Sequence, residues 1–436
     1  MSEGTERGRV PLPFAVVWPR RCGRVAPDDS SRVPGGSGGL RLARRPTNRV
    51  EMGGRFMSAT ITAGRPRGGA LPFMRPTVPP IGEILQCYLP SFGDGMLTNG
   101  KAVARLEAAV SEGLGVSHCV AVSSCTSGLI LVLKALGVRG EVILPSFTFF
   151  ATGHAVLWNG LEPVFADCDP QRWTIDVADV EARITERTGA ILAVHLYGNP
   201  CRINALQEIA SKRRLKLIFD AAHAFGSSYC GSPVGGFGDA EVFSLSPTKL
   251  LVAGEGGLVC TSDSTLARLL RSARNYGDAG SYDPELLGLN ARMAEFNAAM
   301  ALAGLGLVDG KVKRHNEIAE QYTGVLAGTP GIRFQKVNKE DCSAYKDFSV
   351  LISGNEFGMS RDETARALLR DGIETRKYFY PPLHRQKVFA TNGPGGQAPL
   401  PNTDRISEQV LSLPIYESLP SEAVQRIALA IHRLAS

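Results

Sequence analysis

Between about residue 118 and residue 261, short apolar runs alternate with longer segments in which apolar residues recur with a helical period. Short apolar runs bounded by turn residues are typical of buried strands. The expected strands are 119–122, 141–144, 163–166, 190–194, 216–219, 241–244 and 257–261. Because helices separate most of these runs, the pattern predicts βαβ units, and therefore an α/β fold with a mainly parallel sheet and helices on both faces.

The helices expected between these strands are 128–136, 151–158, 177–184 and 205–212, and a further helix around 103–112 precedes the first strand. After about residue 310 the regular alternation ends. The pattern there predicts helices at 311–326, 360–369 and 421–434 and a strand at 347–352. We therefore expect a large domain over residues 73–310 and a smaller C-terminal α+β domain over residues 311–436.

Residues 1–72 are rich in Arg, Gly and Pro and show no helical or strand period, so we predict a disordered tail. The segment contains 13 Arg and five acidic residues and carries +8, whereas the rest of the chain carries −2. The folded part therefore offers no basic patch for nucleic acid. An Arg-rich transit peptide is an alternative, but we favour a true start at Met57 or Met74.

The chain shows no apolar run of the roughly 18 residues that a membrane-spanning helix needs, so no membrane association is expected. Its nine cysteines are scattered and form no C-x-x-C pair. An odd number of cysteines, several of them in apolar runs, favours reduced thiols in the cytoplasm over a disulfide framework or a zinc site. No metal is expected.

One candidate anion site follows the strand at 119–122. The sequence Ser123-Ser124-Cys125-Thr126-Ser127-Gly128 leads into a helix, and the first N–H groups of a helix are free to bind a phosphate. An ordinary helix cap is the alternative, since Ser and Thr cap helices routinely. The glycine-rich patterns of dinucleotide and nucleoside-triphosphate loops are both absent.

Two further segments bear charged residues in apolar surroundings. Asp220 ends the run 216–219, where open α/β sheets place ligands, and it could pair with a protonated ring nitrogen or cap the next helix. Lys249 lies between apolar residues beside the Gly-rich turn 253–257. A buried amine of this kind can form a Schiff base at neutral pH, whereas the alternative is a lysine that extends from a strand end to solvent.

The order of phosphate turn, strand-end Asp220 and Lys249 matches fold-type I enzymes that use pyridoxal 5'-phosphate (PLP). From about Met74 to the end, the chain resembles the DegT/DnrJ/StrS-type sugar aminotransferase family. The matching blocks are Thr98-Asn99-Gly100, VILPSFTFFAT (142–152), AVHLYGNP (193–200), FDAAHAFGSSYCGSPVGGFGDAEVFSLSPTKLLVAGEGG (219–257), GLNARMAEFNAAMAL (288–302), YPPLH (380–384) and SLPIY (412–416).

The resemblance implies a role for several residues and a seven-stranded-type sheet. Lys249 takes the position of the catalytic lysine that holds PLP, and Asp220 that of the partner of the pyridinium nitrogen. The other implied cofactor contacts are His223 near the phenolic oxygen, Phe149 stacked on the ring, Thr126, Ser127 and Ser244 at the phosphate, and Asn290 reaching the phosphate from a second subunit. The resemblance therefore implies a homodimer with shared active sites.

One position departs from the family pattern, and three others are candidates whose roles the resemblance does not assign. The family usually has Gly where Cys125 stands, and a positive φ would be costly for Cys. Tyr380 and His384, at the edge of the C-terminal domain, are candidates for lining the sugar pocket. His195 has the alternative of a strand residue whose neighbours satisfy it.

The resemblance implies a transaminase that moves an amino group from an amino acid, most often glutamate, to a nucleotide-linked keto sugar in amino-sugar biosynthesis. An inosose-type cyclitol or another keto substrate without a nucleotide is an alternative. Relatives that dehydrate sugars carry His in place of the lysine, and Lys249 argues against that reaction. A non-catalytic PLP-fold protein is disfavoured because Lys249, Asp220 and the phosphate turn occur together.

Overall fold

The computed structural model describes residues 69–392 and 398–435. The tail expected over residues 1–72 therefore lies almost entirely outside the described residues. Within its last part, the backbone N–H of Leu71 donates to the carbonyl of Gly372 at 2.7 Å and its carbonyl accepts from Glu374 at 3.0 Å. These bonds join residue 71 to the C-terminal part of the chain.

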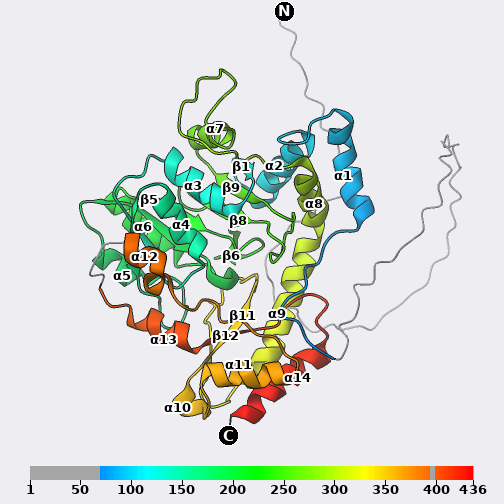
Figure 1. The fold of residues 1–436 in the computed structure, drawn as a ribbon, viewed down its shortest axis with the longest axis vertical. Helices are drawn as coiled ribbons and strands as arrows, with labels where there is room; N and C mark the ends of the chain where they lie inside the picture. Colours follow the sequence, from blue (N-terminus) through cyan, green and yellow to red (C-terminus); the bar gives the residue numbers. More distant parts are fainter. Residues whose placement is uncertain (1–68, 393–397, 436) are drawn as a thin grey trace, which may run out of the picture.

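A seven-stranded sheet lies at the centre of the larger part (Figure 1). In spatial order its strands are β1 (His118–Val122), β9 (Gly257–Thr261), β8 (Ala240–Ser244), β5 (Lys216–Asp220), β4 (Thr188–Val194), β2 (Glu141–Pro145) and β3 (Glu162–Ala166). Only β9 pairs antiparallel with its neighbours, and the other pairs in this sheet are parallel. All seven strands fall on the ranges expected from the sequence, and the mainly parallel α/β class is confirmed.

Helices cover both faces of this sheet. Successive side chains of a strand lie on opposite faces of the sheet. In β1, Ala121 packs in the apolar cluster that contains α2, and Val122 packs in the cluster that contains α3. On the first face lie α1 (Ile81–Gly93), α2 (Lys101–Leu114), α8 (Glu295–Gly304), α5 (Val177–Ala182) and α6 (Ile203–Arg213). On the second face lie α3 (Cys125–Ala135), α4 (Phe150–Trp158) and α7 (Ser264–Ala273).

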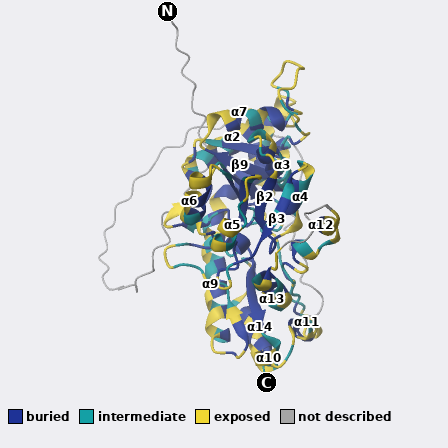
Figure 2. Cartoon of the chain, turned by 90° about the vertical axis from the view of Figure 1, so that its left-hand side faces the viewer, coloured by how far each residue is buried: buried dark blue, intermediate teal, exposed yellow. Residues whose placement is uncertain are grey.

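The C-terminal part is built on a three-stranded antiparallel sheet of β10 (Ile332–Phe334), β11 (Phe348–Ile352) and β12 (Val410–Leu413). Three helices share its apolar core: α9 (Val308–Leu326), which runs between the two parts of the molecule, α11 (Arg361–Arg370) and α14 (Ser421–Leu434). In Figure 2 the buried face of α14 turns inward and its exposed face turns to solvent. The helices expected at 311–326, 360–369 and 421–434 and the strand at 347–352 are confirmed.

The segment between β11 and β12 returns to the large sheet. It contains α10 (Gly354–Phe357), α12 (Lys387–Asn392) and α13 (Pro401–Gln409). The N–H of Leu383 donates to the carbonyl of Ser146 at 3.0 Å, and the N–H of Thr403 donates to the Asp167 carboxylate at 2.7 Å. A short hairpin of β6 (Ser228–Tyr229) and β7 (Ser232–Pro233) completes the strands of the described residues. None of the helices described there is long and apolar enough to cross a membrane.

The N-terminus of α2 depends on one carboxylate from a distant helix. Glu295, the first residue of α8, is fully buried and accepts hydrogen bonds from the backbone N–H groups of Gly100 (2.6 Å), Ala102 (2.6 Å) and Val103 (3.0 Å). The Ser91 hydroxyl donates to the same carboxylate. These N–H groups have no carbonyl within the helix to bind, so the Glu295 side chain satisfies them and ties α1, α2 and α8 together.

Glu295→Ala is therefore expected to lower the free energy of unfolding by about 3 kcal/mol or more, because it leaves buried donors without an acceptor. Urea unfolding followed by circular dichroism measures the change. Glu112→Ala, at an exposed position of α2, is the matched control and should change stability by less than about 0.5 kcal/mol. Equal stability of the two variants would contradict the assignment.

Candidate active site

The turn between β1 and α3 has the geometry of a capped helix start. The Ser124 hydroxyl accepts from the N–H of Ser127 at 3.0 Å, and the Ser127 hydroxyl accepts from the N–H of Ser124 at 3.1 Å. The turn is therefore a helix cap and is also compatible with an anion site. The reciprocal cap leaves the N–H groups of Cys125 and Thr126 at the open end of α3. Those N–H groups can bind an anion.

Cys125 is the first residue of α3 and has no positive φ, so a cysteine fits where the resemblance leads one to expect glycine. Glycine is needed instead on the neighbouring strand. A Cβ on Gly257 would lie 2.6 Å from the backbone nitrogen of Cys125. The close approach of β9 to the turn therefore depends on Gly257.

Asp220 ends β5 and is 5% exposed. One carboxylate oxygen accepts from the Thr152 hydroxyl at 2.7 Å, and the other accepts from the N–H of Ala222 at 3.1 Å and from the Cys125 thiol at 3.9 Å. Burial raises the pKa of Asp220, and the bonds from Thr152 and Ala222 oppose that rise. A buried carboxylate of this kind is stabilised by a cation brought to it.

His223 is buried three residues beyond Asp220. Its Nδ1 accepts the N–H of Tyr197 at 3.2 Å, and its ring stacks on Phe379 with centroids 6.0 Å apart. Burial, aided by the nearby Lys249 and Lys346 charges, holds the pKa of His223 well below its usual value. The ring is therefore neutral, and because Nδ1 accepts a hydrogen bond, the proton lies on Nε2.

Lys249 lies in the loop between β8 and β9 and is partly buried. Its backbone N–H donates to the carbonyl of Ser246 at 3.0 Å, which fixes the loop. Burial, followed by the charge of Lys346, lowers the pKa of Lys249 to about 8. A sizeable fraction of this amine is therefore unprotonated near neutral pH and can attack a carbonyl carbon.

Phe149 and Ser244 lie at the ends of two other elements of the large domain. Phe149 precedes α4, its side chain is 43% exposed, and its ring packs against Phe150 and Phe379. Ser244 ends β8 and is buried, with its hydroxyl 3.4 Å from that of Ser246. Both therefore lie where parallel sheets position ligands, near the carboxyl ends of the strands.

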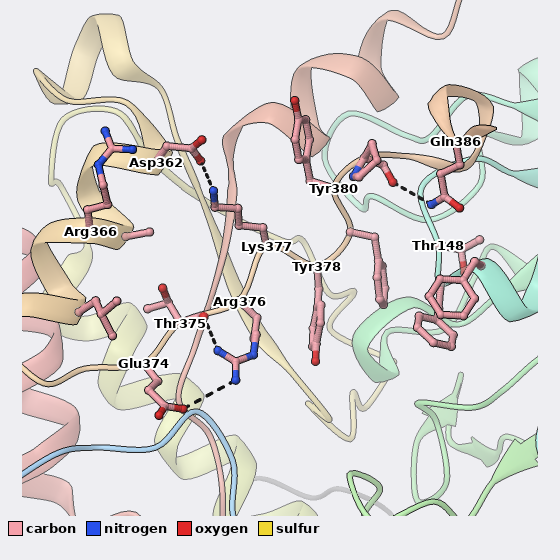
Figure 3. Close-up of a pocket in the computed structure, with 16 residues that line it drawn as sticks. Thr148, Asp362, Arg366, Glu374, Thr375, Arg376, Lys377, Tyr378, Tyr380 and Gln386 are labelled. Atoms are coloured by element: carbon pink, nitrogen blue, oxygen red, sulfur yellow. Dashed lines mark hydrogen bonds and ion pairs between the residues drawn. The ribbon is translucent and has the colours of Figure 1, made fainter. Parts of the chain in front are cut away.

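A cavity of about 650 Å³ opens between the residues at the start of α4 and the segment 374–381 (Figure 3). Its walls are both aromatic and charged, and Figure 3 shows side chains from α11 facing those of the segment. The aromatic lining is Phe149, Phe150, Tyr378, Phe379 and Tyr380, and the charged lining is Asp362, Arg366, Glu374, Arg376 and Lys377. Phe149 connects this cavity to the site around Asp220.

The two candidate substrate residues differ in position. Tyr380 lines the cavity, and the guanidinium of Arg361 lies 4.9 Å from its ring centroid. The His384 ring instead binds the Ser146 hydroxyl at 2.7 Å and lies 3.1 Å from the Asp404 carboxylate. His384 thus fastens the segment 374–386 to β2 and does not line the cavity.

Asn290 and His195 contribute no side-chain hydrogen bond to Asp220, although the backbone N–H of His195 donates to the Asp220 carbonyl at 3.1 Å. Asn290 is exposed and bridges Asn275 in the loop before α8. The neighbouring Ala291 carbonyl accepts from the N–H of Ser123, so this loop borders the turn at α3. His195 is fully buried and its Nε2 lies 2.9 Å from Glu241, which fits the expectation of a strand residue satisfied by its neighbours.

Several residues of the site gave no signal in the sequence. Thr152 was hidden inside a helix pattern, although its position within the block SFTFFAT could have pointed to it. Tyr197 and Phe379 stack on His223, but they come from segments far apart in the chain. Lys346 reaches the site from the C-terminal part of the chain, and no local pattern places it beside Lys249.

The carboxylate, the amine and the helix end of this site can each bind or react with a particular chemical group. A buried carboxylate can pair with a protonated ring nitrogen, a partly unprotonated amine can attack an aldehyde, and an open helix end can bind a phosphate. These are the functional groups of PLP, so the residues present fit that cofactor. The fold and the site together define the class of fold-type I PLP enzymes.

The model of the DegT/DnrJ/EryC1/StrS aminotransferase family matches residues 83–432. The chain belongs to this family. It is 35% identical over 359 residues to dTDP-4-amino-4,6-dideoxy-D-glucose transaminase of Escherichia coli, a match that covers 82% of this chain and 96% of the relative. It is 36% identical to UDP-N-acetyl-3-dehydro-alpha-D-glucosamine 3-aminotransferase of Acidithiobacillus ferrooxidans, covering 81% of this chain and 92% of the relative.

Solved structures agree with this assignment. The structure of DesI with its TDP-sugar product superposes with a TM-score of 0.79 at 36% identity, covering 84% of this chain and 93% of the other. DesV of S. venezuelae gives a TM-score of 0.77 at 33% identity, covering 82% and 95%. The sugar aminotransferase family expected from the sequence blocks is confirmed.

The bond between Thr152 and Asp220 gives a test of the site. Thr152→Val keeps the shape of the side chain and removes the hydroxyl that donates to the carboxylate. Because this bond stabilises the charged form, its loss raises the pKa of Asp220 further, and kcat/KM for amine transfer is expected to fall about tenfold. Thr152→Ser should restore most of the activity. Thr323→Val, at an exposed position of α9, is the control, and an equal effect there would contradict the role.

Proposed function

We propose that this chain binds PLP at Lys249 and transfers an amino group from an amino acid, glutamate in the first instance, to a nucleotide-linked keto sugar. The observation that carries the proposal is the position of Asp220. This buried carboxylate ends β5, has a raised pKa and contributes electrostatically to the environment of the Lys249 amine. The family of the chain and the names of its relatives support the reaction.

Different residues would bind the different chemical groups of the cofactor. Asp220 would hold the proton on the ring nitrogen, and the Nε2–H of His223 would donate to the phenolic oxygen. The pyridine ring of PLP would stack on the side chain of Phe149. The N–H groups at the start of α3, with the side chains of Thr126, Ser127 and Ser244, would bind the phosphate. When bound, PLP supplies an electron sink for the carbanion formed at the donor's α-carbon and stores the amino group between half-reactions.

Lys249 would perform the proton transfers. With a pKa of about 8, the free Lys249 amine would be suited to accept a proton near neutral pH. It would take the proton from the α-carbon of the donor. In the second half-reaction it would return a proton to the sugar carbon that receives the amine.

The cavity favours a nucleotide-linked sugar over a free cyclitol. At about 650 Å³ it has room for more than one ring, and three cations line it together with five aromatic side chains. The cations Arg366, Arg376 and Lys377 could bind a diphosphate. The aromatic rings supply apolar walls for sugar and base.

A homodimer would complete the site. Ile81, Leu85, Leu89 and Phe92 are exposed and recur at helical spacing on α1. An unpartnered apolar face of this kind is suited to burial between two subunits. Asn290 is exposed close to the α3 turn, in keeping with a contact to the phosphate of the partner site.

We also place the enzyme in the cytoplasm. Seven of the eight cysteines in the described residues are buried, and the free thiols include those of Cys87, Cys119, Cys125, Cys168, Cys201, Cys230 and Cys260. Free thiols are retained where the surroundings are reducing. The nucleotide sugars that we propose as substrates are consistent with the same compartment.

Purified protein is expected to be yellow, and borohydride reduction should attach the cofactor to Lys249, as peptide mass spectrometry will show. Lys249→Ala should still bind PLP through the phosphate site, but its turnover should fall by a factor of about 10²–10⁴ because the general acid/base is removed. Colourless protein that takes up no added PLP, or full turnover in the variant, would contradict the proposal.

Arg376→Met tests the substrate class. If Arg376 binds the diphosphate, the variant should raise KM for a nucleotide-linked keto sugar about tenfold and leave KM for glutamate unchanged, since one charge-assisted contact is lost. Steady-state kinetics with a small panel of nucleotide keto sugars measures both constants. Arg370→Met, an exposed residue of α11 outside the cavity lining, is the control. Activity on a free cyclitol that the Arg376 variant retains in full would favour the cyclitol alternative.

A further inference from the structure

A second lysine is buried next to the active site. Lys346 lies just before β11 and is 7% exposed, and its Nζ lies 2.7 Å from a carboxylate oxygen of Asp347, which is 2% exposed. Its backbone N–H donates to the carbonyl of Tyr197 at 2.9 Å, and its Nζ lies 5.4 Å from the centroid of the Tyr378 ring. These contacts hold the ammonium group in one place.

Lys346 and Lys249 line the same small cavity of about 20 Å³. Because Lys346 and Asp347 are both buried, solvent screens their charges poorly. The other charged or titratable residues that line it are Arg75, His315, Tyr416 and Glu417. Glu417 faces His315 at 3.6 Å and accepts from the Thr77 hydroxyl, so its charge has partners of its own.

The charges that act on Lys249 oppose one another. After burial, Lys346 is the largest influence that lowers the pKa of Lys249, while Asp347 and Asp220 raise it less. Cys125 also borders the amine, but burial raises the pKa of its thiol well above the usual value, so it carries no charge near neutral pH. The Lys346–Asp347 pair therefore acts as a dipole whose positive end has the stronger effect on Lys249.

We propose that Lys346, held by Asp347, is a positioning residue whose fixed positive charge keeps the Lys249 amine neutral and nucleophilic. This inference rests on the proposed function of Lys249. In the step concerned, the lone pair of Lys249 Nζ would attack the aldehyde carbon of PLP. The carbon–oxygen double bond would be replaced by a carbon–nitrogen double bond, and the oxygen would leave as water with the two hydrogens of the neutral amine. Only the unprotonated amine can begin this step, so a nearby fixed cation extends the reaction to lower pH.

The same charge acts on His223. After burial, Lys249 and Lys346 are the influences that lower the pKa of this ring. A neutral ring with its proton on Nε2 is what a hydrogen bond to the cofactor's phenolic oxygen requires. Lys346 thus favours the required protonation state of two residues that we assign to the cofactor, without itself touching it.

The test is the pH dependence of the reaction between added PLP and the cofactor-free full-length chain. Visible absorbance follows the rate from pH 6 to 10, and the midpoint of the profile reports the protonation of Lys249. Lys346→Met removes the charge and keeps the length of the side chain, and the midpoint should rise by about one to two pH units. At pH 7 the rate should fall about tenfold for each unit, because the neutral fraction of Lys249 falls by that factor.

Three further variants separate this effect from a loss of structure. Lys346→Arg keeps the charge and should restore the wild-type midpoint. Asp347→Asn removes a negative charge and should move the midpoint in the opposite direction, to lower pH. Lys313→Met, at an exposed position of α9, is the matched control and should leave the profile unchanged.

The outcomes are distinguishable. An unchanged midpoint in Lys346→Met, with a smaller amplitude or with weaker glutamate binding, would overturn the positioning role and leave the function of Lys249 intact. Wild-type protein that gives no absorbance change with PLP would overturn the proposed function, and this inference with it. A raised midpoint that Lys346→Arg restores would support both.

Discussion

The active site depends on one buried carboxylate. Asp220 lies at the end of a central strand, where burial raises its pKa and bonds from Thr152 and Ala222 oppose that rise. A carboxylate in such a position is costly unless it is hydrogen-bonded and paired with a cation. The protein supplies the hydrogen bonds, and we assign the cation to the ring nitrogen of PLP. The cofactor and the carboxylate would then stabilise each other.

The surrounding elements make this burial possible. Strand β9 approaches the α3 turn so closely that Gly257 admits no side chain, and Cys125 packs between that turn and Asp220. Helix α4 presents Thr152 to the carboxylate while Phe149, just before the helix, remains exposed for stacking. The edge of the sheet therefore carries a charged group, an anion site and an aromatic surface within one compact region.

The C-terminal part of the chain completes the site from the other side. Its segment 374–386 is fastened to β2 through Ser146, and this bond places Phe379 against His223 and Tyr380 in the cavity wall. Lys346 lies just before β11, in the same part of the chain. Lys346 lowers the pKa of both Lys249 and His223. The contact between the C-terminal part of the chain and the large sheet therefore affects the protonation of residues that we assign to the cofactor.

The sequence by itself predicted the seven strands of the large sheet, the helices at 311–326, 360–369 and 421–434, and the family. It also singled out Asp220 and Lys249 as candidate site residues. It could do so because strand and helix periods are local, and because the family blocks surround these residues. Helices α1, α7 and α8 were not expected; α8 is rich in alanine and buried on most sides, so its apolar period is weak. Only the tertiary structure decided that Thr152 bonds Asp220, that His384 is a fastening residue, and that Lys346 lies beside Lys249. Those contacts join residues from about 70 to nearly 240 positions apart, and their energies depend on burial, which no local pattern encodes.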